Sequence, residues 1–442
     1  MSKRQNRGNS GGHSNSNHGN QRGLREVYSR GNPRNGQNTE GGNKRTNSGN
    51  EPEVFYCPEL SLVLPKKYHA QPKEDIIQVD GSILEGGGQI LRISSALSCI
   101  LAQPISISKI RACRPKPGLS AQHLSGLKLV TIACEGDLQG AAIRSTQVTL
   151  HPGCVRSGEF SVDTKTAGSV CLLLQTILPC LLFAPSTSAL FLKGGTDADF
   201  APPVDFFRFT FLHYAKLFGI NVSVTRVIRG FFPKGCGEVA LNIEPLKYLT
   251  PVTLTERGQV TSISVCVYVC GTLPSSLAER CLHTAQNMVQ RRFSETKVPV
   301  KTKLVRDEES FGNGWGLRLT AETSLGCVLT STGNGNPKIT PEKLASETTE
   351  QLIKDIDEGG CVDCHMQDQL IILMGLARGV SRVRTGPLTL HTKTAIHLVE
   401  RLTSAQFSVT KVEDCNLGEQ SYLVECKGVG VENVYLAEQS AD

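Results

Sequence analysis

Residues 386–402 read G-P-L-T-L-H-T-K-T-A-I-H-L-V-E-R-L, and residues 162–174 read V-D-T-K-T-A-G-S-V-C-L-L-L. Both stretches contain T-K-T-A, preceded by His391 in one copy and by Asp163 in the other. Apolar residues around each copy are spaced i, i+3, i+4 and i+7, which is typical of one helix face packed on a sheet. We interpret the phrase as a strand-to-helix junction, used once in each repeat of a larger unit.

Short β-rich runs alternate with helical patterns on both sides of the earlier copy. The order β-α-β-α-β-β is expected over residues 76–150 and again over 160–243. A third round is interrupted by a β-α-β-β pattern over 259–330 and resumes with a helix that Thr340 caps and Pro341 opens. These patterns predict an α/β (α+β) fold of three βαβαββ repeats that form the main domain, with a small inserted α/β domain.

The predicted domain boundaries follow from these patterns. Residues 1–70 form a disordered basic tail rich in Gly and Asn, 71–253 hold repeats one and two, and 254–336 form the inserted domain. Residues 337–432 hold the third repeat with His391, and 433–442 form a C-terminal tail.

The positive charge of the chain lies in its first fifty residues. They contain nine Lys or Arg against two Asp or Glu, so the formal charge of +6 for the whole chain belongs to this tail. Ten Gly and eleven Asn leave little to bury, which predicts disorder. A basic arm can hold RNA through counterion release, and a solubilising extension fits equally well.

The composition also excludes several classes of protein. Sixteen Cys without an apolar leader indicate free thiols in a reducing compartment, and no stretch is apolar enough to span a membrane. Cys361–His365 matches the C-x-x-C-H signature for haem attachment, which requires export. A zinc site would need a second ligand pair, and none lies nearby at zinc-finger spacing, so we interpret the match as coincidence.

His391 is the candidate nucleophile. A helix N-terminus carries unpaired N–H groups and partial positive charge, which disfavours the imidazolium cation and attracts phosphate. Neutral imidazole is a nucleophile. Asp163 at the other copy fits a capping carboxylate, and His397 fits a structural role. A surface or capping histidine is the alternative for His391.

Two further junctions carry groups suited to phosphate. D-G-S-I-L-E-G-G-G-Q-I-L-R over 80–92 places Glu85, a candidate ligand for a divalent cation, before Arg92, one helical turn inside the next helix. A glycine-rich turn with a solvated Glu is the alternative. I-R-A-C-R-P-K-P-G-L-S-A-Q-H over 110–123 sets three cations on a proline-stiffened segment, which favours phosphate binding over a solvated charge run.

Taken together, these phrases resemble the RNA 3′-terminal phosphate cyclases over about residues 76–430. The resemblance is carried by D-G-S-I-L-E-G-G-G-Q-I-L-R, P-G-L-S-A-Q-H-L-S-G-L, D-T-K-T-A-G-S-V-C-L-L, L-K-G-G-T-D-A-D-F-A-P-P and L-T-L-H-T-K-T-A-I-H, in this order. It implies ATP-dependent conversion of an RNA 3′-phosphate to a 2′,3′-cyclic phosphodiester, through a histidine–AMP adduct and an RNA–AMP anhydride. It also implies ATP as co-substrate and Mg²⁺ or Mn²⁺ as the metal.

The resemblance also implies roles for individual residues. His391 would be the nucleophile and Glu85 the metal ligand. The positions that match the phosphate and RNA site are Arg92, Arg111, Gln122 and His123, and those that match the ATP pocket are Gln175, Pro202, His365, Asp368, Gln369 and His391. His365 stands where relatives usually carry Tyr, and Cys113 and Cys236 stand where Gly is usual.

Three other functions are compatible with such a fold. A non-catalytic RNA-binding relative that acts in ribosome assembly would lack the catalytic histidine, and an enolpyruvyl transferase would be longer and carry other loops. A scaffold with an idle site is the third. The resemblance predicts RNA ending in a 3′-phosphate as partner and the nucleus, in the nucleoplasm, as location, with the cytoplasm as a second location. It leaves protein partners unknown.

Overall fold

A computed structural model describes residues 53–57, 75–412 and 420–437 of the chain. Most of the predicted N-terminal tail, at residues 1–52 and 58–70, lies outside the described residues. Within that tail, however, Glu53–Cys57 forms the strand β1, which pairs antiparallel with β6 (Glu159–Asp163). Val54, Phe55 and Tyr56 are residue types that favour strands, so the expectation of disorder through residue 70 was too broad.

The first repeat forms a four-stranded sheet covered by two helices. Its sheet has the order β2-β3-β5-β4, in which β2 and β3 run parallel and the other pairs antiparallel. Its elements are β2 (Ile77–Asp80), α1 (Gly88–Leu101), β3 (Ile105–Ser108), α2 (Ala121–Ala133), β4 (Asp137–Gln139) and β5 (Val148–His151).

The second repeat has the same topology, with β1 added at one edge. Its sheet runs β6-β7-β9-β8, again with one parallel pair. A π-helical turn, η3, interrupts the helix expected over 204–218. The elements after β6 are α3 (Val170–Leu181), β7 (Ser188–Gly194), α4 (Val204–Phe206), η3 (Phe207–Phe211), α5 (Leu212–Leu217), β8 (Val222–Gly230) and β9 (Gly237–Ile243).

The third repeat repeats this strand order as β10-β16-β18-β17. The three sheets therefore confirm the predicted α/β fold of βαβαββ units. The elements of this repeat are β10 (Thr253–Leu254), α8 (Gln367–Leu376), β16 (Val380–Thr385), α9 (Leu390–Leu402), β17 (Gln406–Lys411) and β18 (Tyr422–Lys427).

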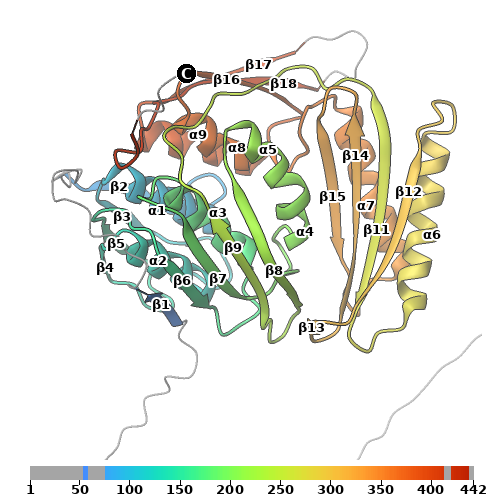
Figure 1. Cartoon of the computed structure of the whole chain (residues 1–442), viewed down its shortest axis with the longest axis horizontal. Coiled ribbons are helices and arrows are strands. Elements are labelled where there is room, and N and C mark those ends of the chain that lie inside the picture. Colours follow the sequence, from blue (N-terminus) through green and yellow to red (C-terminus); the bar gives the residue numbers. More distant parts are fainter. Residues whose placement is uncertain (1–52, 58–74, 413–419, 438–442) are drawn as a thin grey trace, which may run out of the picture. The chain divides into compact units, whose positions relative to one another are not determined.

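An inserted α/β unit separates β10 from α8. Its sheet has the order β12-β11-β14-β15, and α6 and α7 lie on the same side of it (Figure 1). The short strand β13 (Ser310–Phe311) pairs with β8 of the second repeat. The other elements are β11 (Val260–Cys270), α6 (Ser275–Arg292), β12 (Val300–Asp307), β14 (Gly314–Thr323), β15 (Val328–Asn334) and α7 (Pro341–Asp357).

The helix α7 differs from the expectation that the third repeat resumes at residue 337. Leu344, Ala345 and Leu352 on α7 are buried in the same hydrophobic cluster as the strands of the inserted sheet. Thr340 caps this helix as predicted, accepting a hydrogen bond from Lys343 N at 3.2 Å. The packing therefore assigns α7 to the inserted unit.

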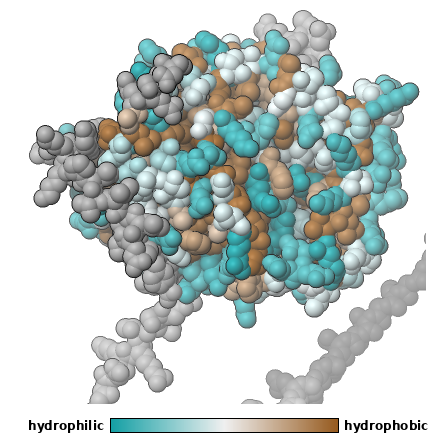
Figure 2. Space-filling view, in the orientation of Figure 1, coloured by the Kyte–Doolittle hydropathy of each residue, from teal (hydrophilic) through white to brown (hydrophobic). Residues whose placement is uncertain are grey.

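Helices from the three repeats pack on one another. Helix α1 packs against α2, α3 and α9, and α9 packs against α8, so one hydrophobic core runs through all three repeats. On the face drawn in Figure 2, hydrophobic residues stand in several groups among hydrophilic ones. Among the described residues, no helix has the length and apolarity to cross a membrane.

The last residues of the chain that the structure describes are attached to the second repeat. Asn433 is buried and donates from Nδ2 to the carbonyl oxygen of Ala184 at 2.9 Å. The ammonium group of Lys247 donates to the carbonyl oxygens of Asn433 and Leu436, at 3.3 and 2.5 Å. The part of the predicted C-terminal tail at 433–437 is therefore docked, and 438–442 lie outside the described residues.

The two T-K-T-A copies do not occupy equivalent places. In the first copy, Thr164–Ala167 form a loop, and α3 begins later, after the cap Ser169. In the second copy, Thr392–Ala395 lie inside α9, which the cap Thr389 opens. Moreover, α3 is the first helix of its repeat and α9 is the second helix of its own. The interpretation as one junction used once per repeat was therefore wrong.

Candidate active site

The start of α9 holds His391 as the second residue of the helix. The hydroxyl of Thr389 accepts a hydrogen bond from Thr392 N at 3.1 Å, which satisfies one of the free N–H groups of the first turn. The side-chain oxygen of Gln367 on α8 accepts from Thr389 N at 3.2 Å and from the Thr392 hydroxyl at 2.7 Å. The two helices of the third repeat thus fix the position of His391.

The start of α1 depends on glycines. A Cβ atom at Gly87 would lie 2.2 Å from Glu85 Oε1, and one at Gly88 would lie 2.4 Å from His123 Nε2. Any larger residue at these two positions would therefore displace Glu85 or His123. We expected the glycines to admit a ligand, whereas here they admit side chains of the protein itself.

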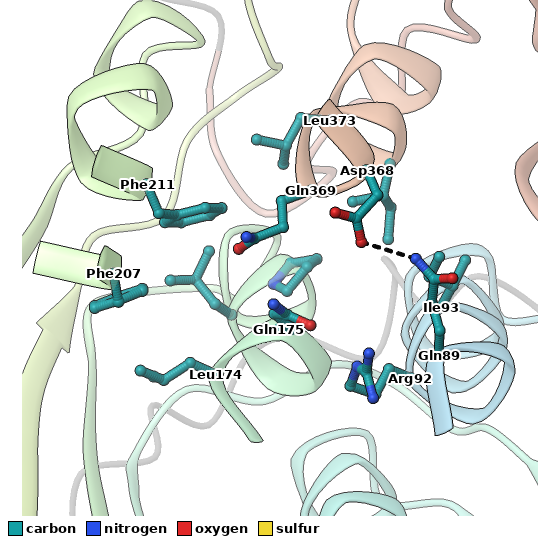
Figure 3. A pocket seen from close by; sticks show the side chains of 13 residues that line it. Gln89, Arg92, Ile93, Leu174, Gln175, Phe207, Phe211, Asp368, Gln369 and Leu373 are labelled. Atoms are coloured by element: carbon teal, nitrogen blue, oxygen red, sulfur yellow. Dashed lines mark hydrogen bonds between the residues drawn. The ribbon is translucent and has the colours of Figure 1, made fainter. Parts of the chain in front are cut away.

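A hydrogen-bonded relay connects His391 to the first repeat. Gln89 Oε1 lies 3.2 Å from His391 Nδ1, and Gln89 Nε2 donates to Asp368 Oδ2 at 2.9 Å, as Figure 3 shows for the second bond. Because the amide nitrogen of Gln89 faces the carboxylate, its oxygen faces His391 and accepts a hydrogen bond from Nδ1–H. The other ring nitrogen, Nε2, then carries the lone pair.

The surroundings of His391 keep its imidazole neutral. The residue is open to the cleft, yet partial burial among its neighbours lowers its pKa below the ordinary 6.5. The carboxylate of Glu85 raises the pKa of His391, while the positive charges of Arg92 and Arg114 lower it. Neutrality was predicted from the helix N-terminus, but burial is the largest cause here.

Asp368 is a carboxylate with a shifted pKa. Burial raises its pKa to about 6, although Arg92, His365 and the hydrogen bond from Gln89 each act to lower it. This group therefore changes its charge near neutral pH, directly beside the amide that orients His391.

His391 opens into a cleft of about 460 Å³. Ligand sites for drug-sized molecules usually measure about 300–1,000 Å³, so the cleft has room for a nucleotide. Its walls contain every residue predicted for the ATP pocket, together with Arg92, Phe200 and two residues of the inserted unit. The predicted residues are Gln175, Pro202, His365, Asp368, Gln369 and His391, and the two from β15 are Thr332 and Asn334.

An apolar pocket adjoins this cleft. Figure 3 shows Gln175 and Gln369 pointing into it between Asp368 on one side and Phe207 and Phe211 on the other. Both phenylalanines belong to the π-helical turn η3, and their rings stack with centroids 5.4 Å apart. The polar groups of the cleft therefore rest on an apolar wall, which strengthens electrostatic interactions in front of it.

Arg92, Gln122 and His123 line a second, smaller pocket. Burial lowers the pKa of His123 to about 3, with further lowering by Arg92 and Arg111, so its imidazole is neutral. Gln122 Oε1 accepts from Ser169 N at 2.8 Å, at the cap of α3. Of the four residues predicted for the RNA and phosphate site, Arg111 is the one that does not line this pocket. Its guanidinium group donates to the carbonyl oxygen of Gly118 at 2.9 Å.

Glu85 lies beside Arg114 of the basic segment. Its Oε1 forms an ion pair with Arg114, while its Oε2 is buried without a hydrogen-bond partner. Mg²⁺ is commonly bound by one or two carboxylates together with substrate phosphates, and a free carboxylate oxygen fits that donor set. Among the described residues, no group of three His, Cys, Asp or Glu side chains that could hold a metal ion occurs.

Comparison with known proteins identifies the family. The sequence model of the family described as RNA 3′-terminal phosphate cyclase matches residues 83–409. The chain belongs to this family. A probable RNA 3′-terminal phosphate cyclase of Dictyostelium discoideum is 41% identical over 359 residues, 80% of this chain and 82% of the relative. The cyclase of Drosophila melanogaster is 39% identical over 357 residues, covering 81% and 98%. That of Pyrobaculum neutrophilum is 35% identical over 354 residues, covering 80% and 99%.

Several residues of this cyclase-family site were not found by sequence reasoning. Gln89 was part of a quoted motif, and its signal was a polar side chain on an otherwise apolar helix. Arg114 was counted as a cation of the basic segment without its link to Glu85. Thr332 and Asn334 gave no signal at all, because their place in the cleft depends on how the inserted unit docks.

All three departures from the family pattern can be located. Cys236 lies in the turn between β8 and β9 with φ of 60°, a backbone conformation that favours glycine. Cys113 is exposed within the basic segment. His365 lines the cleft and is exposed, with its ring edge-on to Phe206 at a centroid distance of 6.4 Å.

Proposed function

We propose that this protein converts an RNA 3′-terminal phosphate into a 2′,3′-cyclic phosphodiester at the expense of ATP, through a histidine–AMP intermediate. The observation that carries the proposal is the relay of His391, Gln89 and Asp368. It directs an unprotonated Nε2 into a cleft large enough for a nucleotide. The relatives that share most of this chain are named for the same activity.

In the first step, His391 Nε2 attacks the α-phosphorus of ATP, forming an N–P bond while the bond to pyrophosphate breaks. Nδ1 keeps its proton and donates a hydrogen bond to Gln89 Oε1, which stabilises the positive charge that develops on the ring. Covalent catalysis divides one difficult displacement into easier steps, and an N–P bond is labile enough to pass AMP on.

In the second step, an oxygen of the RNA 3′-phosphate attacks the phosphorus of the adduct, and the neutral imidazole of His391 leaves. The product is an anhydride between the RNA phosphate and AMP. In the third step, the neighbouring 2′-hydroxyl loses its proton and attacks the 3′-phosphorus, and AMP leaves. The 2′,3′-cyclic phosphodiester results.

Both substrates bring negative charge to the cleft. Arg92 borders both the large cleft and the small pocket with Gln122 and His123, so it lies between the two phosphate sites. Glu85 would hold Mg²⁺ or Mn²⁺, which supplies charge neutralisation for the phosphates of ATP. Cationic groups fixed in place before the substrates bind stabilise the developing charge without reorganisation.

The test is incubation of the purified protein with Mg²⁺ and ATP labelled at the α-phosphate. We expect an acid-labile label on the wild type, which transfers to RNA ending in a 3′-phosphate, and none on His391→Ala. His397→Ala is the matched control, because it removes another exposed histidine from the same helix. Label on His391→Ala would place the nucleophile elsewhere. Absence of label on the folded wild type, with RNA still bound, would favour a non-catalytic RNA-binding protein.

A further inference from the structure

Phe200 is an aromatic side chain that the fold leaves in solvent. Its exposed fraction is 104%, the largest among the exposed hydrophobic residues of the described part of the chain, and its φ of 61° lies in the left-handed region. This conformation is uncommon for a bulky residue and costs free energy. Phe200 also lines the cleft that contains His391. A strained backbone conformation at Phe200 thus keeps an unpacked aromatic ring at the candidate active site.

The loop that carries Phe200 is anchored on both sides. Asp197 accepts hydrogen bonds from buried Arg229 at 2.9 Å and from the Tyr268 hydroxyl at 2.6 Å. Asn334 Nδ2 donates to the carbonyl oxygen of Ala198 at 3.3 Å. Pro202 and Pro203 restrict the backbone after Phe200. The position of the ring is therefore set by the second repeat together with the inserted unit, and not by contacts of the ring itself.

We propose that Phe200 is a stacking platform for the base of the 3′-terminal nucleotide of the RNA. This inference rests on the proposed function and adds to it the part of the RNA that the cleft recognises. Single-stranded RNA is commonly bound by stacking its unpaired bases on aromatic side chains. A phenyl ring offers a face to every base and no hydrogen bond to any, so stacking on Phe200 is tolerant of sequence.

The order of the reaction favours the RNA base over the adenine of ATP. ATP enters first, and AMP is already attached to His391 when the RNA arrives. Of the residues implied for the nucleotide, Pro202, Asp368 and Gln369 are at least half-buried in the walls of the cleft, whereas His365 and His391 are exposed. Phe200 stands free at the open side, where the second substrate must enter. The terminal base is the part of the RNA next to the reacting phosphate, so it is the base that can reach this ring.

The two half-reactions separate these assignments. Formation of the histidine–AMP adduct needs ATP alone, whereas its discharge needs RNA. We expect Phe200→Ala to form the adduct within about twofold of wild type and to lower kcat/KM for the RNA about 10-fold or more, in the range that loss of one stacked base produces. Phe200→Trp should retain the wild-type value. Phe232→Ala is the matched control, because Phe232 is 81% exposed and does not line the cleft.

A second substrate makes the test specific to the terminal base. RNA whose 3′-terminal nucleotide lacks its base should react poorly with the wild type, and Phe200→Ala should lower its rate no further, because the two changes remove the same contact. Additive losses would overturn the proposal. Impaired adduct formation in Phe200→Ala would assign the ring to adenine, and unchanged discharge would show that it binds neither base. Failure of the wild type to form the adduct would instead refute the proposed function itself.

Discussion

The two T-K-T-A segments share four residues and have different structures. In the first, Asp163 Oδ1 accepts a hydrogen bond from Lys165 N at 2.7 Å, and Lys165 has φ of 53°, so the chain turns before the helix. In the second, Thr389 caps the helix and the same four residues lie in its first two turns. The four shared residues therefore do not decide the local structure. The position of the residue that caps each helix decides it.

The surroundings of the two segments differ in the same way. Asp163 ends a strand, and its carboxylate is used by the backbone of its own loop and by Lys165. His391 is the second residue of α9, where Gln89 of α1 reaches it and is itself held by Asp368 of α8. A reactive side chain at a helix start thus needs partners from elsewhere in the fold. A helix start alone is not a site.

Exchanging the two side chains should have the largest effect. His391→Asp makes the second segment read D-T-K-T-A, like the first, and an Asp is well tolerated near a helix N-terminus. We expect adduct formation to fall by at least about 10⁴-fold, as on loss of other catalytic nucleophiles. Asp163→His added to His391→Asp should restore nothing, because no relay reaches residue 163. Label from the α-phosphate of ATP measures both, and label on the double variant would show that the relay is dispensable.

Removing the relay while keeping His391 should have a smaller effect. In Gln89→Leu the ring loses the acceptor that holds its proton on Nδ1, so both tautomers become available. We expect the rate of adduct formation to fall on the order of 10- to 100-fold, as for other partners that orient a functional imidazole. Gln290→Leu, at an exposed position of α6 that does not line the cleft, is the matched control. An unchanged rate in Gln89→Leu would mean that the start of α9 alone orients the ring.

The pH dependence of adduct formation should report Asp368. Its pKa of about 6 means that the carboxylate is ionised above this pH and protonated below it. Protonation weakens its hydrogen bond from Gln89, so the rate should fall by up to about tenfold per pH unit below 6. Asp368→Asn keeps an acceptor oxygen and should lose this acidic limb of the pH–rate profile. The limb that remains should be that of His391, whose pKa is below 6.5. An identical profile in Asp368→Asn would assign the limb to His391 instead.

The smallest effects are expected at the two caps. Ser169→Ala and Thr389→Ala each remove a hydroxyl that accepts from the first turn of a helix, at 3.3 and 3.1 Å. Each should lower the free energy of unfolding by about 1 kcal/mol, measured by urea denaturation. At equal stability loss, we expect only Thr389→Ala to slow adduct formation, since only α9 carries the nucleophile. Equal rates in both variants would show that the position of His391 does not depend on its cap.

Much of the fold was predictable because its signals are local. Period-2 and period-3.6 patterns identified the strands and helices of three repeats, and the Thr340 cap marked the start of α7. The partner sheet of α7 was not predictable, because an amphipathic helix between two units carries the same pattern whichever sheet it covers. The short strand β1 was missed because the composition of its neighbours outweighed the three strand-favouring residues Val54, Phe55 and Tyr56.

The site was predictable as a set of residues and not as a mechanism. The motifs identified His391, Glu85 and Arg92, and in the structure the charges of Glu85 and Arg92 both act on His391. Neutrality of His391 was expected for the wrong main reason, since its burial arises from tertiary packing that no local pattern reveals. Gln89 could not be assigned from its motif either, because its two partners lie 279 and 302 residues away along the chain.

The same separation has a consequence for the newly made protein. Proteins fold from the N-terminus while they are synthesised, and Gln89 has left the ribosome long before Asp368 and His391. Until α8 and α9 dock on α1, the first repeat carries an exposed helix face and half of a relay. Under the proposed function, the chain therefore gains its reactivity toward ATP only late in its synthesis, when the last repeat packs on the first.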